Sequence, residues 1–209
     1  MWRVGHISDP LNFPPRERCS WANRFDDSRR QFRTLYCSRE KATALRETLA
    51  DFRPNTKALA EFRDLAATDS GDSVFPRPRV PIGWRRKRLL APALVEYIAG
   101  GDLVDLNDLR VRADLERIHA GLLHRHGMDH LDISQIRSRD RDVTQEVARA
   151  LFDLGAAGVA YGSNLDDLPC YALFEDRARL IPDGDPELLD PAHAEFMRIC
   201  LEFGLASST

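Results

Sequence analysis

Four polar side chains of this sequence carry functional groups of the kinds that bind anions or stabilise charge in enzyme sites. Arg24 has a planar, permanently charged guanidinium, which suits phosphate groups. Glu47 has a carboxylate, which can stabilise a positive charge that develops during a reaction. Tyr36 and Ser163 add hydroxyl groups that can donate hydrogen bonds. Each also has an ordinary structural interpretation: a loop arginine, an exposed helix glutamate, a half-buried strand tyrosine and a turn serine.

Other constellations that carry chemistry are absent from the sequence or weak. It has no GxGxxG, GxxxxGK[ST], HExxH or GxSxG motif. Four histidines occur between residues 119 and 130, but a solvated or helix-capping role is favoured over a metal site. The basic run 85–88 could contact phosphates. It lacks the interleaved aromatic residues of single-strand binders, so an exposed surface is favoured over a nucleic-acid site.

The elements around Tyr36 and Glu47 are predicted to be a strand followed directly by a helix. Apolar or aromatic residues alternate with polar ones over 32–37, which predicts the strand. Ser38 is placed to cap a helix that begins near Arg39 and ends before Pro54. The apolar side chains that this helix turns inward are Ala42, Leu45, Leu49 and Phe52, which form one stripe along it. Glu47 lies almost opposite this stripe, so periodicity alone predicts a solvated side chain.

The rest of the chain alternates between helices and short strands. Residues 68–83 are rich in turn formers and predict a loop. Helices are predicted over 111–127 and 142–154, and Pro191 opens a closing helix. The side chains expected to face inward from these helices are Val111, Leu115, Ile118, Leu122, Val143, Val147, Ala150, Leu151, Leu154, Phe196, Ile199, Cys200 and Phe203. Strands are predicted at 159–161, 171–174 and 179–181.

This order of elements lacks regular βαβ alternation and therefore predicts an α+β fold. We expect strands from the two ends of the sequence to share one sheet. Such a sheet would bring Arg24, Tyr36 and Ser163 close together despite their separation in sequence. Tyr161 and Gln145 are lesser candidates for the site, with core packing and a helix surface as their ordinary roles.

Composition predicts one globular domain. The chain has 209 residues, of which 43% are hydrophobic, and a formal net charge of -3, which argues against disorder and against a protein that coats nucleic acid. No stretch reaches the ~20 apolar residues of a membrane span. The first residues lack the apolar run of a secretory signal, so we expect a soluble cytoplasmic protein. The four cysteines form no CxxC pair and predict buried or unreactive thiols: Cys19, Cys37, Cys170 and Cys200.

Several short motifs, taken in their order and spacing, resemble the RES domain family, named for an arginine, a glutamate and a serine. An "RF" precedes an "LY" strand, a glutamate follows the tyrosine by eleven residues, and a late "YGS" precedes "ALFE". The resemblance covers most of the chain and is weakest over about 64–110. The segments that carry it are Asn23-Arg24-Phe25-Asp26, Phe32-Arg33-Thr34-Leu35-Tyr36-Cys37-Ser38, Ala44-Leu45-Arg46-Glu47, Gly158-Val159-Ala160-Tyr161-Gly162-Ser163 and Tyr171-Ala172-Leu173-Phe174-Glu175.

The resemblance implies an ADP-ribosyltransferase-like fold, with a mixed sheet core and surrounding helices. We expect a single domain over 1–209 that carries a largely helical insertion at about 64–135. It also implies site residues: Arg24, Glu47 and Ser163 as catalytic groups, and Arg24, Tyr36 and Ser163 as ligand-binding groups. Tyr161, a lesser candidate, is added to the expected ligand-binding groups. No metal and no prosthetic group is expected.

The resemblance further implies an enzyme that degrades NAD by cleaving its nicotinamide–ribose bond. Inorganic phosphate is the expected co-substrate for phosphorolysis, and water takes its place in hydrolysis; the sequence does not separate the two. Many such proteins are toxins neutralised by a DNA-binding antitoxin, and a homodimer is plausible for the family. Three alternatives stay open: a protein ADP-ribosyltransferase, a non-catalytic interaction module, and nucleic-acid binding through 85–88.

Overall fold

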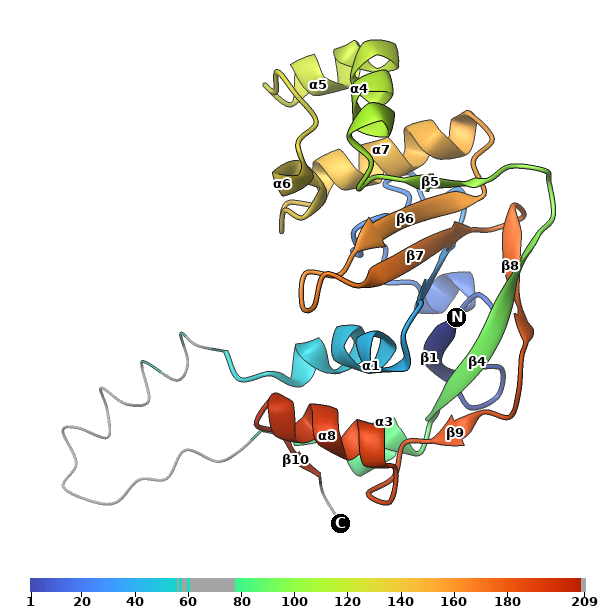
Figure 1. Cartoon of the computed structure of the whole chain (residues 1–209), viewed down its shortest axis with the longest axis vertical. Coiled ribbons are helices and arrows are strands. Elements are labelled where there is room, and N and C mark those ends of the chain that lie inside the picture. The colour runs from blue at the N-terminus through green and yellow to red at the C-terminus, as the bar shows by residue number, and fades with distance from the viewer. Residues whose placement is uncertain (56, 58–59, 61–77, 208–209) are drawn as a thin grey trace.

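An eight-stranded mixed sheet forms the centre of the molecule in the computed structural model (Figure 1), which describes residues 1–55, 57, 60 and 78–207. Only the β5–β6 pair is parallel among the pairs of this sheet. The α+β class predicted from the sequence is confirmed. Across the sheet the strands are β5 (Leu103–Asp105), β6 (Gly158–Gly162), β7 (Pro169–Phe174), β2 (Thr34–Ser38), β1 (Trp2–His6), β4 (Arg88–Tyr97) and β8 (Ala178–Pro182), with β9 (Glu187–Leu188) on β4.

The sheet divides where β1 meets β2. These two strands share one register pair, Trp2 with Ser38, whereas β2 pairs with β7 over its whole length. The part built on β5, β6, β7 and β2 therefore diverges from the part built on β1, β4 and β8 (Figure 1). Helix α1 (Lys41–Leu49) follows β2 directly and lies beside this division.

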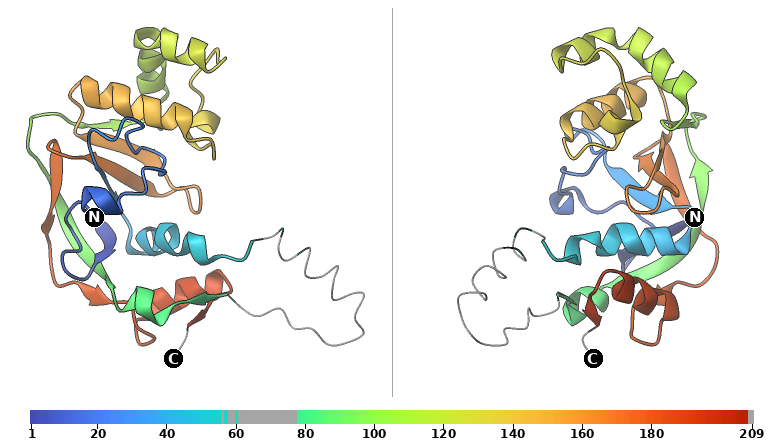
Figure 2. Two further views of the ribbon diagram at one scale, coloured as in Figure 1. Left: turned by 180° about the vertical axis from the view of Figure 1, so that it is seen from behind. Right: turned by 60° about the vertical axis from the view of Figure 1, so that its left-hand side comes forward.

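Helices cover the two parts of the sheet separately. Helix α7 packs over β6 with the smaller helices above it, while α8 packs against α1 on the other side (Figures 1 and 2). Each group encloses its own core, the first around Phe25, Phe174 and Leu106, the second around Leu45, Phe196 and Ile199. The remaining elements are η1 (Arg16–Arg18), η2 (Ala50–Phe52), β3 (Arg79–Val80), α3 (Ile82–Arg85), α4 (Leu109–Ile118), α5 (Ala120–Arg125), α6 (Ile133–Ile136), α7 (Asp142–Asp153), α8 (Ala194–Glu202) and β10 (Ala206–Ser207), which pairs with β3.

The strand–helix unit around the candidate site matches the prediction closely, with one correction at its junction. Leu45 and Leu49 are fully buried, as the predicted stripe requires. Ser38 does not cap the helix, because it is the last residue of β2 and its hydroxyl lies 3.3 Å from the Cys170 thiol. Glu40 occupies the N-cap position instead, without a side-chain cap hydrogen bond.

Two helix predictions need correction. The helix expected over 111–127 is broken at His119, whose ψ of 34° is not helical, so Ile118 turns outward and is 52% exposed. Leu154, expected to face inward, follows the last residue of α7 and is 58% exposed. The other strands and the closing helix lie within a few residues of the predicted ranges.

The range of the expected insertion contains strands as well as helices. Residues 64–77, which include most of the predicted 68–83 loop, lie outside the described residues. Within the described part, β4 pairs with β1 over five registers and β5 pairs with β6. Among the described residues of this range, helices are concentrated in 109–136, whereas 88–105 carries strands β4 and β5, so the expected helical character is wrong for 88–105. Among the described residues no helix has the length and apolar character needed to traverse a bilayer.

Candidate active site

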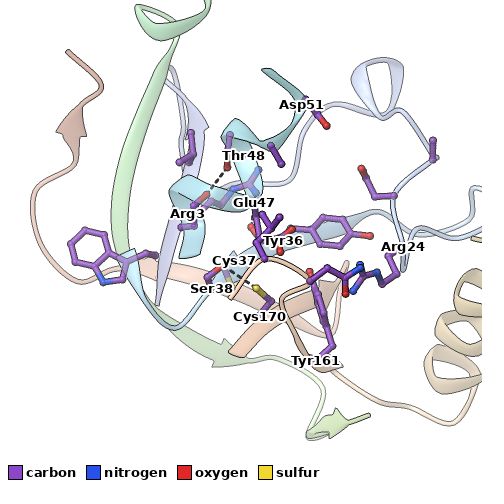
Figure 3. A pocket seen from close by; sticks show the side chains of 18 of the residues that line it. Arg3, Arg24, Tyr36, Cys37, Ser38, Glu47, Thr48, Asp51, Tyr161 and Cys170 are labelled. Carbon is purple, nitrogen blue, oxygen red and sulfur yellow. Dashed lines mark hydrogen bonds between the residues drawn. The ribbon is translucent and has the colours of Figure 1, made fainter. Parts of the chain in front are cut away.

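One cavity of about 610 Å³ opens between β2, α1, β6 and the loop that precedes β2 (Figure 3). This volume lies within the roughly 300–1,000 Å³ typical of small-molecule sites. Arg24, Tyr36, Glu47 and Tyr161 all line it, although they come from distant parts of the sequence. The predicted convergence follows from the sheet order, because β7 connects β2 to β6.

Arg24 reaches the cavity from a loop that is anchored in the core. Its neighbour Phe25 is fully buried, with its ring 4.8 Å from that of Tyr161, and the Arg24 guanidinium lies 5.4 Å from the centroid of the same Tyr161 ring. The Arg24 Nε and Nη1 atoms are buried and have no hydrogen-bond partner in the described part of the chain. Burial lowers the pKa of this guanidinium, yet an arginine stays charged at neutral pH. Buried, unpaired donors of this kind call for an acceptor from outside the described part of the chain.

Tyr36 and Gln145 hold the Arg24 loop from two sides. The Tyr36 hydroxyl donates to Asp26 Oδ1 at 3.0 Å and accepts from the Phe25 N–H at 3.0 Å. Burial raises the Tyr36 pKa well above its usual value, so the phenol keeps its proton at neutral pH. Gln145 donates to the Asn23 carbonyl at 2.9 Å and is 8% exposed, so its ordinary role as a helix surface residue is wrong.

Glu47 lies on the cavity wall, half-buried, in contact with Ser163. The Ser163 hydroxyl donates to Glu47 Oε1 at 2.6 Å and accepts from the Leu165 N–H at 3.0 Å. Ser163 is 1% exposed and lies behind Glu47, outside the set of residues that line the cavity. The structure therefore brings the serine to the carboxylate, and a direct contact between Ser163 and a ligand stays a prediction.

Four further arginines line the same cavity and were not singled out from the sequence: Arg3, Arg53, Arg139 and Arg141. Arg3 is fixed by hydrogen bonds to the Pro10 and Tyr36 carbonyls, at 3.0 and 2.7 Å, and burial lowers its pKa to about 10. None of the four, nor Arg24, forms an ion pair within the described part of the chain. The carboxylates on the wall are Glu47 and Asp51, so the cavity has an excess of positive charge.

Other sequence candidates lie away from this chemistry or are unreactive. Burial raises the pKa of both Cys37 and Cys170 to about 12, so these cavity-wall thiols stay protonated. Arg85 is buried and bonds to the Leu189 carbonyl, so the run 85–88 is not a continuous exposed basic surface. Across the described residues no three His, Cys, Asp or Glu side chains are grouped as a metal ion would need.

A comparison with protein-family models shows to which family this chain is related. The family model for the RES domain matches residues 1–191. The chain belongs to the RES domain family. Among curated proteins and among solved structures no match is found. RES domains are associated with NAD-related enzymatic activity, and the four positions that carry the resemblance surround a single cavity or, for Ser163, contact its glutamate. Helix α8 lies beyond the matched residues.

Proposed function

We propose that this RES protein cleaves the nicotinamide–ribose bond of NAD. The observation that carries the proposal is that Arg24 and Glu47 line the same cavity. The buried donors of Arg24 have no hydrogen-bond partner in the described chain. A dinucleotide supplies phosphate oxygens for the guanidinium and a ribose for the carboxylate. Family membership points to the same ligand.

The chemistry follows from how charge changes along the reaction. The C–N bond to nicotinamide breaks with both electrons going to the ring, so nicotinamide leaves uncharged and needs no general acid. Positive charge develops on the ribose, as in glycoside cleavage. Glu47 stabilises this charge electrostatically, and the hydroxyl of Ser163 holds the carboxylate in place. An oxygen of phosphate or water then bonds to the same carbon.

We further propose that inorganic phosphate is the acceptor. The pyrophosphate of NAD carries two negative charges, whereas five arginines line the cavity without ion pairs in the described chain. The excess suits a second anion beside the dinucleotide. Arg3 of β1, held by the Pro10 and Tyr36 carbonyls, provides a rigid cation for this second anion. Phosphorolysis would give nicotinamide and ADP-ribose 1″-phosphate.

Chromatography of products from NAD, with and without inorganic phosphate, tests the proposal. We expect nicotinamide release that requires phosphate. Nicotinamide release without phosphate would mean that water is the acceptor and that the reaction is hydrolysis at the same site. ADP-ribose found on added protein would indicate a protein ADP-ribosyltransferase, and no release in any condition would favour the non-catalytic interaction module.

NAD consumption would also make the chain a toxin, with the cytoplasm as its place of action. A DNA-binding antitoxin and a homodimer are then the proposed partners. Expression in a bacterial host should lower cellular NAD and arrest growth, whereas expression of Glu47→Gln should do neither.

A further inference from the structure

We propose that Asp166, acting with Thr43 and Arg46, is a positioning residue that holds the 163–168 segment on α1 so that Ser163 can orient Glu47. The inference rests on the proposed function, because it concerns how that site is kept in its working geometry. It adds groups that neither touch the cavity nor belong to the four positions of the family resemblance.

Asp166 joins the segment between β6 and β7 to helix α1. Its Oδ2 atom accepts a hydrogen bond from the Thr43 hydroxyl at 2.8 Å and another from Arg46 Nη1 at 2.9 Å. Thr43 is fully buried, and the Asp166 and Arg46 side chains are 13% and 14% exposed. Thr43 precedes Glu47 by four residues, so both project from the same face of the helix. The segment is thus fixed to the helix face that carries Glu47.

The same segment determines where the Ser163 hydroxyl points. The Ser163 N–H donates to the Leu168 carbonyl at 3.0 Å, and the Asp167 N–H donates to the Ser163 carbonyl at 3.1 Å. The Leu165 N–H donates to the Ser163 hydroxyl, whose one proton therefore goes to Glu47. Because these bonds form a compact turn, a shift of the segment relative to α1 would move the Ser163 oxygen away from the carboxylate.

Arg46 extends this contact to helix α8. Its Nε and Nη2 atoms bond to the two carboxylate oxygens of Glu202, both at 2.8 Å. Helix α8 lies alongside α1 (Figure 2) and beyond the residues matched by the RES model. Burial alone would raise the pKa of Asp166, but hydrogen bonds from Thr43, Leu168 and Arg46 outweigh it and lower the pKa. Asp166 is therefore ionised and able to hold both partners at neutral pH.

Steady-state kinetics of Thr43→Val and Asp166→Asn test the inference. Thr43→Val keeps the shape of the side chain but removes the hydroxyl. We expect kcat to fall roughly 10- to 100-fold in both variants, as misplacement of a reacting group does, with KM for NAD changed less than about twofold. Thr43→Ser, which retains the hydroxyl, should restore kcat. Asp114→Asn on α4, which loses an exposed ion pair to Arg117, is the matched control and should behave as wild type.

Crystal structures of the wild type and Thr43→Val give a readout that does not depend on turnover. We expect the Ser163 Oγ to Glu47 Oε1 contact, 2.6 Å here, to be lost in the variant. The inference would be overturned if Thr43→Val kept the contact between Ser163 and Glu47, or if its kcat were unchanged. A KM for NAD that rises in proportion to the loss of kcat would also overturn it. If the wild type releases no nicotinamide, the proposed function fails, and the Ser163–Glu47 distance still decides the positioning role. If Asp166→Asn does not fold, the two threonine variants carry the test.

Discussion

Glu47 is half-buried on the cavity wall, with one carboxylate oxygen engaged by Ser163. Replacing it by glutamine removes the negative charge but leaves an oxygen that can still accept from the serine. We expect Glu47→Gln to lower nicotinamide release about 100-fold or more, because the charge on the ribose loses its stabilising partner. The midpoint of thermal unfolding should shift by less than about 2 °C. Product chromatography measures the nicotinamide release, and a thermal melt of the same preparation measures the midpoint of unfolding.

A large drop in the melting midpoint of Glu47→Gln would assign the residue a structural role instead. Ser163→Ala separates the two interpretations, because it removes the positioning hydroxyl and keeps the carboxylate. Its turnover should fall less than that of Glu47→Gln.

Glu175 gives the molecule a stability that depends on pH. It accepts from the Arg33 N–H and Nε and from Arg16 Nη2, each at 2.9 Å. Burial alone would raise the pKa of Glu175, but the hydrogen bonds from Arg33 and the charges of Arg33 and Arg16 outweigh it and lower the pKa. Because the pKa in the folded state lies below its unfolded value, this contribution is complete above the unfolded pKa. It disappears as the pH falls through the folded pKa.

We therefore expect Glu175→Gln to lower the free energy of unfolding by roughly 1–3 kcal/mol at pH 7. The difference from wild type should shrink as the pH falls through the lowered folded-state pKa of Glu175, because the wild-type carboxyl then becomes protonated as well. Urea denaturation at a series of pH values measures this difference in the free energy of unfolding. A difference that stays constant with pH would contradict the ionic origin.

At the scale of elements, the sequence predicted the regions with a clear period and missed two strands of the sheet centre. Strand β4 carries apolar residues on both faces, including fully buried Leu90 and Ala93, and contains Pro92, so neither alternation nor strand composition marks it. Strand β1 is five residues long and is flanked by no turn signal on its amino side. Both are strands because they pair with each other, which is a long-range contact that local periodicity does not report.

Gly5 occupies a position of β1 that has no room for a side chain. A Cβ atom built there would lie 2.0 Å from the Pro10 carbonyl oxygen, which is backbone and cannot move aside. We expect Gly5→Ala to destabilise the fold by roughly 3 kcal/mol or more. Gly121→Ala on α5, where a Cβ meets no atom within 4 Å, is the control and should stabilise by roughly 0.5–1 kcal/mol. Urea denaturation of the two variants compares them, and equal stabilities would contradict this account.

The candidate site was predictable only in part, because it too is formed by contacts between residues that are far apart in the sequence. Arg24, Tyr36, Glu47 and Ser163 were found through their resemblance to a family, since periodicity alone makes Glu47 an exposed helix residue. The other cavity arginines come from β1, from the end of η2 and from the loop before α7. No local pattern distinguishes them from surface arginines. Their shared property, the absence of an ion pair in the described chain, exists only in three dimensions.

At the scale of the whole molecule, the cavity lies between the two parts of the sheet and takes its wall from both. Arg3 and Glu47 belong to the part near β1 and α8, whereas Tyr161 and Arg141 belong to the part near β6 and α7. A ligand that contacts both parts binds the native state and not the unfolded chain. Its binding therefore stabilises the entire fold by mass action.

ADP-ribose is the probe for this coupling, because it carries the pyrophosphate of NAD but no cleavable nicotinamide bond. At 100 times its dissociation constant it should stabilise the protein by about 2.7 kcal/mol, which corresponds to a rise of roughly 5–10 °C in the thermal midpoint. Arg24→Met should abolish most of the rise, since it removes the buried donors that have no partner in the described chain. Arg179→Met, which breaks a cross-strand ion pair with Glu96 away from the cavity, should keep it. Equal rises in both variants would mean that ADP-ribose binds elsewhere.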